Sequence, residues 1–346
     1  MSGNDISIER IAYAATVIDE RFRNTPQYTD ELLSAALGRP TLVKVETTNP
    51  LRSFKGRGAE FLLHELSADV RTVVCASSGN FGQGIAYAGR RRGVPVHVFS
   101  TRTANPVKLA RLRSLGAAIT QVDGDGTTAK QAAHEHVRQH PGAVLVEDGR
   151  EPAIAEGAGT IAIELLRTDA PDTVVLPVGD GSLIAGVASW IKHAAPSTRI
   201  VGVGVTGAPA LADSLRAGRV VTGGPVDTIA EGIAIRVPVR QSVDRLRDLV
   251  DDMVLVEDAD LLAAMRLIAD TLGILVEPAG AAGIAAIAKH DLGEHPATVL
   301  TGANPRPGLP HTVLGSDHLP ASASRRARRT DAARRPAERA PAGEPS

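Results

Sequence analysis

Aromatic side chains are scarce in this sequence, and so are cysteine, lysine and long apolar runs. Phe, Trp and Tyr make up 3% of the 346 residues, so the core must consist mainly of Ala, Val, Leu and Ile. Because 34 glycines accompany this aliphatic bias, the composition favours a Val- and Ile-rich parallel sheet covered by Ala- and Leu-rich helices. The length suits one large domain or two that pack together.

The chain also lacks the marks of a secreted, membrane-bound or nucleic-acid-binding protein. Its single cysteine, Cys75, excludes an internal disulfide and fits a reducing compartment. No run approaches the roughly 18 apolar residues that a membrane helix requires, and no secretory signal stands at the N-terminus. The formal net charge of −1 argues against nucleic acid or a membrane surface as the main partner. We therefore expect a cytoplasmic protein.

Lysine is rare, because only six of the 38 basic residues are lysines. The sequence uses arginine almost everywhere that a positive charge alone is needed. Arginine keeps its proton in proteins, whereas a desolvated lysine can lose it. A lysine in a glycine-rich turn, as in Lys55-Gly56-Arg57-Gly58, is therefore a candidate reactive amine.

From about residue 72 onward, short apolar runs alternate with stretches of helical periodicity. The predicted strands are 72–76, 96–100, 118–122, 143–147, 173–178, 200–205, 253–256 and 298–301. The predicted helices between them include 81–91, 106–115, 127–139, 155–166 and 183–193. This alternation predicts right-handed βαβ crossovers and an α/β fold with a mostly parallel sheet.

The last 31 residues, 316–346, differ in composition from the rest of the chain. They contain seven Arg against four acidic residues and almost no large apolar side chain. We predict a disordered basic tail. A solubilising role is favoured over the recognition of an acidic partner.

Three segments combine small and polar residues in places where ligands bind. Ser77–Gly84 (Ser-Ser-Gly-Asn-Phe-Gly-Gln-Gly) and Gly179–Leu183 (Gly-Asp-Gly-Ser-Leu) each follow a predicted strand. In parallel sheets, ligands bind where such loops enter helix N-termini. The first loop suits a carboxylate, and the glycines of the second suit a phosphate. The third segment, Asn49–Ala59, turns into a helix and carries Lys55 beside Phe54.

These three segments, in this order and spacing, resemble the threonine dehydratase and serine racemase branch of the fold type II (tryptophan synthase β-like) pyridoxal-phosphate enzymes. Segments 227–234, 277–282 and 301–304 also agree with that branch, so the resemblance covers roughly residues 25–305. It implies a two-domain α/β fold with parallel sheets flanked by helices, and a homodimer. The large cofactor-binding domain would comprise 1–71 and 148–315, and a small domain, 72–147, would close over the substrate.

The resemblance assigns a role to each matching residue. Lys55 would form a Schiff base with pyridoxal 5′-phosphate and move protons at the substrate Cα. Phe54 would pack against the cofactor, Asn80 would bond its phenolic oxygen, and Thr301 would face its pyridine nitrogen. The residues that would bind its phosphate are Gly179, Asp180, Gly181, Ser182 and Leu183. The residues beside the substrate carboxylate would be Ser77, Ser78, Gly79 and Gln83.

The hydroxyl of Thr301 would make the cofactor a weaker electron sink than a carboxylate would, which favours early loss of a β-hydroxyl. The expected reaction is β-elimination from L-threonine or L-serine, giving a 2-oxo acid and ammonia. Ser78 keeps racemisation open, because a hydroxyl there can deliver a proton to the opposite face of Cα. The residues also leave open a β-replacement synthase and, on the same fold, a cofactor-free binding module.

Three positions depart from the pattern of such enzymes. Phe81 stands where relatives usually have His, and Asp180 interrupts a run of glycines that binds the phosphate. A carboxylate beside a phosphate dianion is unfavourable unless it points away or binds another group. The segment Gly204–Gly207 lacks the acidic residue with which racemase-like relatives bind a metal, so we expect no metal site.

Overall fold

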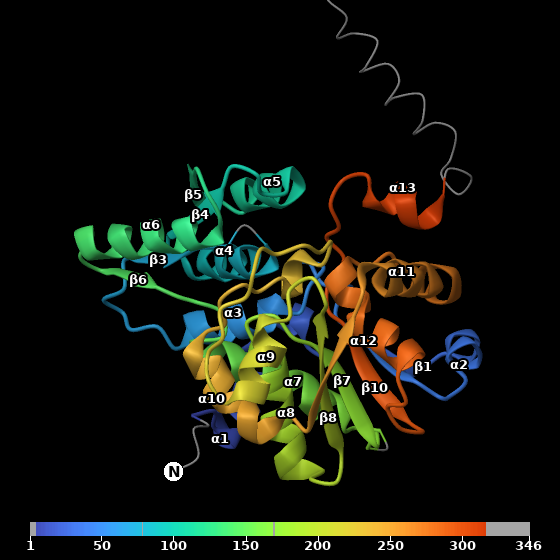
Figure 1. Ribbon diagram of the computed structural model, residues 1–346. Helices are drawn as coiled ribbons and strands as arrows, with labels where there is room; N and C mark the ends of the chain where they lie inside the picture. The colour runs from blue at the N-terminus through green and yellow to red at the C-terminus, as the bar shows by residue number, and fades with distance from the viewer. Residues whose placement is uncertain (1–4, 78, 169, 316–346) are drawn as a thin grey trace, which may run out of the picture. The chain divides into compact units, whose positions relative to one another are not determined.

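Two β-sheets form the framework of the protein (Figure 1). The computed structural model describes residues 5–77, 79–168 and 170–315. The chain up to Arg306 forms one compact unit. A separate unit begins at Pro307, and its described part contains the short helix α13 (Leu309–Leu314).

The larger sheet has six strands in the order β1-β2-β10-β7-β8-β9. They are β1 (Gln27–Thr29), β2 (Leu42–Val45), β7 (Thr173–Pro177), β8 (Arg199–Val205), β9 (Asp252–Val256) and β10 (Pro296–Leu300). The edge pair β1–β2 is antiparallel, and the other pairs are parallel, with Val174 opposite Ile200 and Val175 opposite Thr298. Helices cover both faces of such a sheet, and every residue of the central strands β7 and β10 is accordingly buried.

The smaller sheet has four parallel strands in the order β5-β4-β3-β6. They are β3 (Thr72–Cys75), β4 (Val96–Thr101), β5 (Ala118–Val122) and β6 (Ala143–Leu145). All eight strands predicted from the sequence are present, and the α/β fold with mostly parallel sheets is confirmed. The boundaries of the large and small domains stay predictions, and the tail 316–346 lies outside the described residues.

The five predicted helices are also present, with ends that differ by no more than three residues. They are α4 (Asn80–Arg92), α5 (Pro106–Ser114), α6 (Gly126–Gln139), α7 (Pro152–Leu165) and α8 (Ser182–Ala194). The other helices of the compact unit are α1 (Ile8–Val17), α2 (Glu31–Leu37), α3 (Lys55–His64), α9 (Ala210–Ala217), α10 (Arg240–Leu249), α11 (Asp258–Leu272), α12 (Pro278–Lys289) and the short 3₁₀ helices η1 (Glu20–Phe22) and η2 (Glu231–Ile233).

The helix ends follow local signals in the sequence. Asn105 caps α5 by accepting a hydrogen bond from the N–H of Val107 at 3.0 Å, and Pro106 occupies the first helical position. Asp125 caps α6 in the same way, accepting from the N–H groups of two threonines. Helix α4 ends at Gly93, whose φ of 69° is left-handed.

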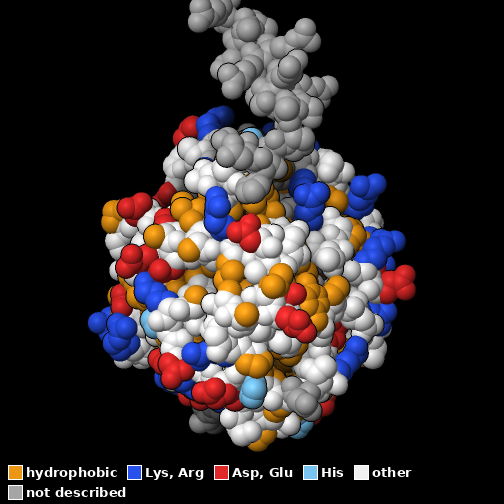
Figure 2. All heavy atoms as spheres, turned by 90° about the vertical axis from the view of Figure 1, so that its right-hand side faces the viewer, with side chains coloured by type: hydrophobic (Ala, Val, Ile, Leu, Met, Phe, Trp, Pro, Cys, Tyr) orange, Lys and Arg blue, Asp and Glu red, His pale blue; other side chains and the backbone are white. Residues whose placement is uncertain are grey.

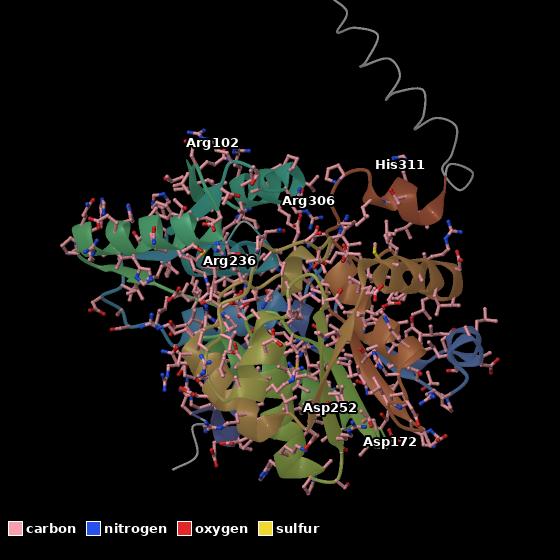
Figure 3. All side chains as sticks on the ribbon, viewed as in Figure 1. Arg102, Asp172, Arg236, Asp252, Arg306 and His311 are labelled. Atoms are coloured by element: carbon pink, nitrogen blue, oxygen red, sulfur yellow. The ribbon has the colours of Figure 1, made fainter. Side chains whose placement is uncertain are left out.

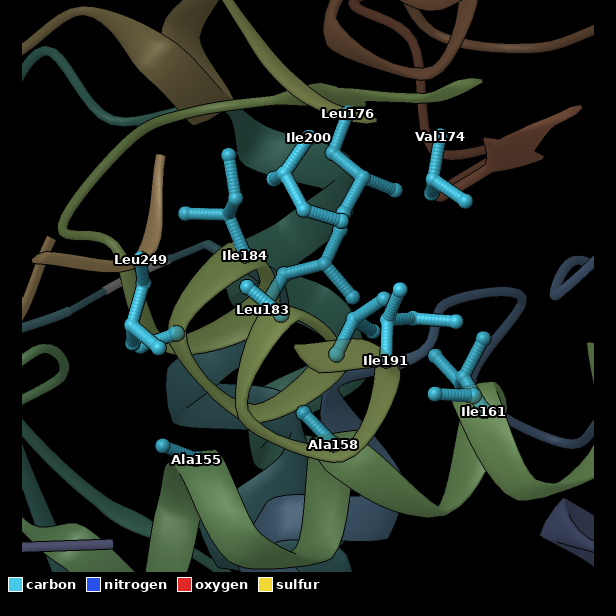
Figure 4. Packing of buried hydrophobic residues seen from close by; sticks show 14 of the residues in the cluster. Ala155, Ala158, Ile161, Val174, Leu176, Leu183, Ile184, Ile191, Ile200 and Leu249 are labelled. Atoms are coloured by element: carbon cyan, nitrogen blue, oxygen red, sulfur yellow. The ribbon is translucent and has the colours of Figure 1, made fainter. Parts of the chain in front are cut away.

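Aliphatic side chains of α7 and α8 form the main core against the larger sheet (Figure 4). Ala155, Ala158 and Ile161 of α7 pack beside Leu183 and Ile191 of α8. Val174 and Leu176 of β7 and Ile200 of β8 close the cluster from the sheet. Small residues at the crossing let the two helix backbones approach closely. A core of this kind needs few aromatic rings, as the composition predicts.

A fully buried arginine connects three elements of the compact unit. Arg57, in the first turn of α3, donates to both carboxylate oxygens of Glu46 at 2.8 and 2.9 Å and to both of Glu164 in α7 at 2.8 and 2.9 Å. Lys44 on β2 also pairs with Glu164, at 2.6 Å. Burial raises the pKa of Glu164, but the hydrogen bonds and charge of Arg57 outweigh it and lower the pKa to about 2.

Charged side chains of both signs are interspersed over the face seen in Figure 2. Among the described residues, no helix is long and apolar enough to cross a membrane.

Replacing Arg57 with methionine should lower the free energy of unfolding by about 3–5 kcal/mol, because two buried carboxylates would keep only Lys44 as a cation. Urea denaturation measures the change. Arg216→Met is the control, since Arg216 makes an exposed ion pair with Asp213 and should change the free energy by less than about 0.5 kcal/mol. A loss below about 1 kcal/mol in Arg57→Met would contradict the role given to this network.

Acid should destabilise the protein partly through His97 on β4. Burial, followed by the charges of His136 and His140, lowers the pKa of His97, whose ring stacks on Phe99 with centroids 4.6 Å apart. The unfolded chain then binds a proton more readily than the folded one, so this stability is present above the unfolded pKa and is lost as the pH falls. Urea denaturation at pH 7.5 and 5.5 should show a smaller acid loss in His97→Gln than in the parent, and equal losses would refute the assignment.

Candidate active site

A cavity of 510 Å³ lies at the carboxyl ends of strands from both sheets. The loops after β3, β6, β7 and β10 line it, together with the first residue of α3. Ligands of open parallel sheets bind at this edge, where loops and helix N-termini meet. Of the residues that the sequence predicts for the site, those that line the cavity are Phe54, Lys55, Ser77, Gly79, Asn80, Gly179, Asp180, Gly181, Ser182, Leu183 and Thr301.

Lys55 reaches the cavity because a tight turn fixes the residues before it. The Asn49 carboxamide oxygen accepts from the N–H of Leu51 at 3.0 Å and of Ser53 at 3.3 Å. The turn is fastened to the loop after β10, since the N–H of Phe54 donates to the Thr301 carbonyl at 3.1 Å. The segment that leads into α3 is thereby attached to the residue that follows β10.

The ε-ammonium of Lys55 has an ion-pair partner that the sequence analysis missed. Nζ donates to Oδ2 of Asp148, lies 3.4 Å from Oγ of Ser182, and stands 4.5 Å from the ring centroid of Phe54. The Lys55 and Asp148 side chains are 16% and 10% exposed. Asp148 comes three residues after β6, and a carboxylate just beyond the end of a parallel strand is the signal that could have found it.

Buried Arg245 of α10 holds the loop that carries Asp148. Its guanidinium donates to the carbonyls of Gly149 at 2.8 Å and Arg150 at 2.7 Å, and it pairs with Asp5. Gly149 has a φ of 77°, and its backbone packs directly against Asp180. The loop after β6 in the smaller sheet therefore rests on the loop after β7 in the larger one.

Asn80, at the start of α4, belongs to a polar network that joins the two sheets. Its Nδ2 donates to Glu277 at 2.6 Å, and its Oδ1 accepts from Nδ2 of Asn304 at 2.9 Å. Arg111 of α5 donates to Oδ1 of Asn304 at 2.5 Å, and Lys108 of α5 pairs with Glu277 at 3.7 Å. Glu277 and Asn304 lie in segments that the resemblance covers, but the sequence analysis gave them no role.

Charged residues at the cavity rim pair with one another. Lys108 lies 3.2 Å from Glu231 of η2, and Arg306, labelled in Figure 3, pairs with the same carboxylate. Arg236, also labelled there, lies 3.3 Å from Asp125 at the start of α6. These contacts link the segment around η2 to helices α5 and α6.

The loop Gly179–Leu183 combines a helix start with a half-buried carboxylate. Gly181 has a φ of 91°, which turns the chain into α8. Among the described residues, no hydrogen bond of this loop uses a backbone N–H of residues 179–183 as donor, so these groups are available to an anion. Burial, followed by the negative charge of Asp148, raises the pKa of Asp180 to about 6.

The proposed substrate loop is only partly described. Ser77 Oγ accepts from the N–H of Gly79 at 3.3 Å, and Phe81 also lines the cavity. Gln83 is 1% exposed within α4 and does not line the cavity, so its contact with a substrate stays a prediction. Ser78 lies outside the described residues, and so does the racemisation role predicted for it. Among residues 5–77, 79–168 and 170–315, no group of three His, Cys, Asp or Glu side chains is arranged to hold a metal ion.

Comparison with known proteins identifies the class. The model of the family described as "Pyridoxal-phosphate dependent enzyme" matches residues 18–302. The chain therefore belongs to this family, in the fold type II group, and its cofactor is pyridoxal 5′-phosphate.

Ammonia-lyases and serine racemases are among the proteins to which the chain is similar. An L-threonine ammonia-lyase of Geobacter sulfurreducens is 34% identical over 82% of this chain and 72% of its own, and a serine racemase of Arabidopsis thaliana is 32% identical over 81% and 87%. Among solved structures, a threonine deaminase of T.th. has a TM-score of 0.81 at 31% identity, covering 86% of this chain and 98% of its own. Maize serine racemase has a TM-score of 0.84 at 28% identity, covering 94% and 99%.

The residues of the cavity fit this cofactor. Its volume lies within the range of about 300–1,000 Å³ that is usual for small-molecule sites. The amine of Lys55 is the nucleophile with which an aldehyde can form a Schiff base. The unused N–H groups at the start of α8 and the Asn80 carboxamide are donors suited to a phosphate and a phenolic oxygen. The carboxylate of Asp180, within the phosphate loop itself, is the feature that opposes an anion.

Gly149→Ala should destabilise the protein by more than the strain of a positive φ alone, because the added Cβ would also collide with Asp180. A Cβ at this position would collide with the Asp180 carbonyl oxygen, whereas Gly38, which also has a positive φ of 72°, faces open space. Gly38→Ala should cost about 1 kcal/mol of unfolding free energy and leave cofactor affinity unchanged. Gly149→Ala should cost about 2–4 kcal/mol and weaken cofactor binding at least about tenfold, and equal effects of the two substitutions would count against the packing described.

Proposed function

We propose that this enzyme is an ammonia-lyase that converts L-threonine, L-serine or both to a 2-oxo acid and ammonia by β-elimination. The observation that carries the proposal is the amine of Lys55 inside a cavity that also contains Thr301 and Asn80. The similarity to L-threonine ammonia-lyases at 34% identity supports the same activity.

Each residue has a task in this reaction. Lys55, Asn80 and Gly179–Leu183 would hold the cofactor at its aldehyde, phenolic oxygen and phosphate, and Thr301 would face the pyridine nitrogen. When bound, pyridoxal phosphate acidifies the Cα–H bond of an amino acid and accepts electron density from it. Nζ of Lys55 takes the Cα proton as a general base, while Ser77 and Gly79 orient the substrate carboxylate.

The hydroxyl of Thr301 favours elimination over a long-lived carbanion. A threonine hydroxyl is too weak an acid to keep a pyridine nitrogen protonated, so negative charge at Cα is poorly stabilised. Loss of the β-hydroxyl removes that charge at once. We also propose that the small domain, 72–147, closes over the substrate and excludes water from the cavity.

Serine racemisation is the second candidate activity. It is favoured by the similarity to serine racemases, of which the Arabidopsis protein is 32% identical over 81% of this chain. Both activities use the same Lys55 and differ in whether the β-hydroxyl leaves before Cα is reprotonated.

We further propose that the enzyme is a cytoplasmic homodimer. The composition and the family resemblance support this. Cys75, the single cysteine, is buried, and burial raises the pKa of its thiol to about 12, which leaves it unsuited to disulfide exchange at neutral pH.

Lys55→Ala should abolish the visible absorbance of the lysine-bound cofactor and lower 2-oxo acid release at least about 100-fold, because it removes both the amine and the base. Keto acid release is measured with L- and D-serine, L-threonine and 3-hydroxyaspartate. Lys192→Ala is the matched control, since Lys192 pairs with Asp251 away from the cavity and its loss should leave turnover unchanged. Chiral analysis of recovered serine completes the test: inversion faster than pyruvate release would replace the lyase assignment with the racemase.

A further inference from the structure

Asp180 is unlike the other carboxylates of the cofactor cavity. Among the described residues, the carboxylates that line the cavity belong to Glu147, Asp148, Asp180, Glu231 and Glu277. All except Asp180 have a cation partner. Glu147 pairs with Arg150, and Asp148 pairs with Lys55. Glu231 pairs with Lys108 and Arg306, and Glu277 also pairs with Lys108. Asp180 makes no ion pair with a described residue.

One oxygen of the Asp180 carboxylate is also enclosed, although the residue as a whole is half-buried. Its Oδ1 is inaccessible to solvent and accepts no hydrogen bond from a described residue. An ionised carboxylate that has lost water from one oxygen without gaining a donor there is disfavoured relative to the neutral acid. The Gly149 backbone packs against the backbone and Cβ of Asp180, which fixes the start of this side chain between the two loops.

The charged groups around Asp180 come from three elements. Asp148 and Glu147 approach from the loop after β6, Lys130 from α6, and Lys55 from the start of α3. The two lysines favour the ionised form of Asp180 and the two carboxylates oppose it, and Lys55 is already engaged by Asp148. From α10, Ser242 places an uncharged hydroxyl against Gly181, and Arg245 is engaged by Asp5 and two carbonyls.

We propose that Asp180 takes up a proton from solvent when the cofactor binds and holds the phosphate as a neutral acid, donating its O–H to a phosphate oxygen. This inference rests on the proposed cofactor site and deepens it. A phosphate dianion at the start of α8 adds negative charge beside a carboxylate that burial and Asp148 already disfavour, so protonation removes the repulsion. The proton turns the one unfavourable group of the loop into an additional donor.

A pH dependence of phosphate-ester affinity follows from this linkage. The pKa of Asp180 before binding is about 6 because of burial and the nearby Asp148 charge. Above that pH the carboxylate must be protonated on binding, and each further pH unit weakens binding up to about tenfold. Below it the acid is already neutral and the cost disappears.

The test uses pyridoxine 5′-phosphate and the cofactor-free full chain, because this alcohol analogue binds without reacting with Lys55. Calorimetry from pH 5.5 to 8.5, in two buffers of different ionisation enthalpy, gives the Kd and the number of protons taken up. Asp180→Asn removes the titration and keeps an N–H donor. Asp180→Gly serves if the asparagine variant folds poorly, and Asp213→Asn, a change of an exposed carboxylate, is the matched control.

At pH 8 the parent and Asp213→Asn should take up about one proton more per bound ligand than Asp180→Asn, and should bind at least about tenfold more weakly. The ratio of their Kd to that of Asp180→Asn should fall toward a constant below pH 6. A ratio that is independent of pH, with equal proton uptake in all variants, would overturn the proposal and leave the cofactor site intact. Failure of every variant to bind the analogue, together with failure of the parent to take up pyridoxal phosphate, would overturn both.

Discussion

The buried guanidinium of Arg57 is the constraint on which the active site depends. It lies two residues after Lys55, in the first turn of α3, and its hydrogen bonds to Glu46 and Glu164 fix that turn against β2 and α7. Movement of a buried charge of this kind is costly, because separating it from the two carboxylates would leave buried ions without full compensation. The orientation of α3, which carries Lys55, therefore depends on Arg57, Glu46 and Glu164, and none of these residues lines the cavity.

Above this anchor, the site is assembled from loops that belong to different sheets. Asn80 and Arg111 come from helices beside the smaller sheet, while Glu277 and Asn304 belong to segments beside the larger one. Direct hydrogen bonds connect them, so the position of the smaller sheet is coupled to the polar groups around the cofactor. Several loops each supply one group to the site. Changes in a loop sequence can therefore alter substrate specificity without displacing the amine of Lys55.

The electrostatics of the cavity are shaped by its carboxylates as much as by its lysines. Asp148 holds the Lys55 ammonium, and Arg245 in turn holds the loop of Asp148 by its carbonyls. Asp180 adds a second acid within the loop that is proposed to bind the cofactor phosphate. If an anionic cofactor binds beside such a carboxylate, its affinity depends on pH. A loop made only of glycines would have no such dependence.

The sequence by itself determined the class of fold, the eight predicted strands and the cavity-lining positions of Lys55, Asn80, Gly179–Leu183 and Thr301. The strands followed from local signals, since alternating periodicity and glycine turns act over short stretches of chain. The site positions followed from the resemblance of six short segments to a known family. The ion pair of Lys55 with Asp148, the Arg57 network and the contact of Gly149 with Asp180 were decided only by the tertiary structure. The first two join residues 93 and 107 positions apart, and the third joins loops of different sheets. No local pattern encodes which loops meet when two sheets close on one cavity.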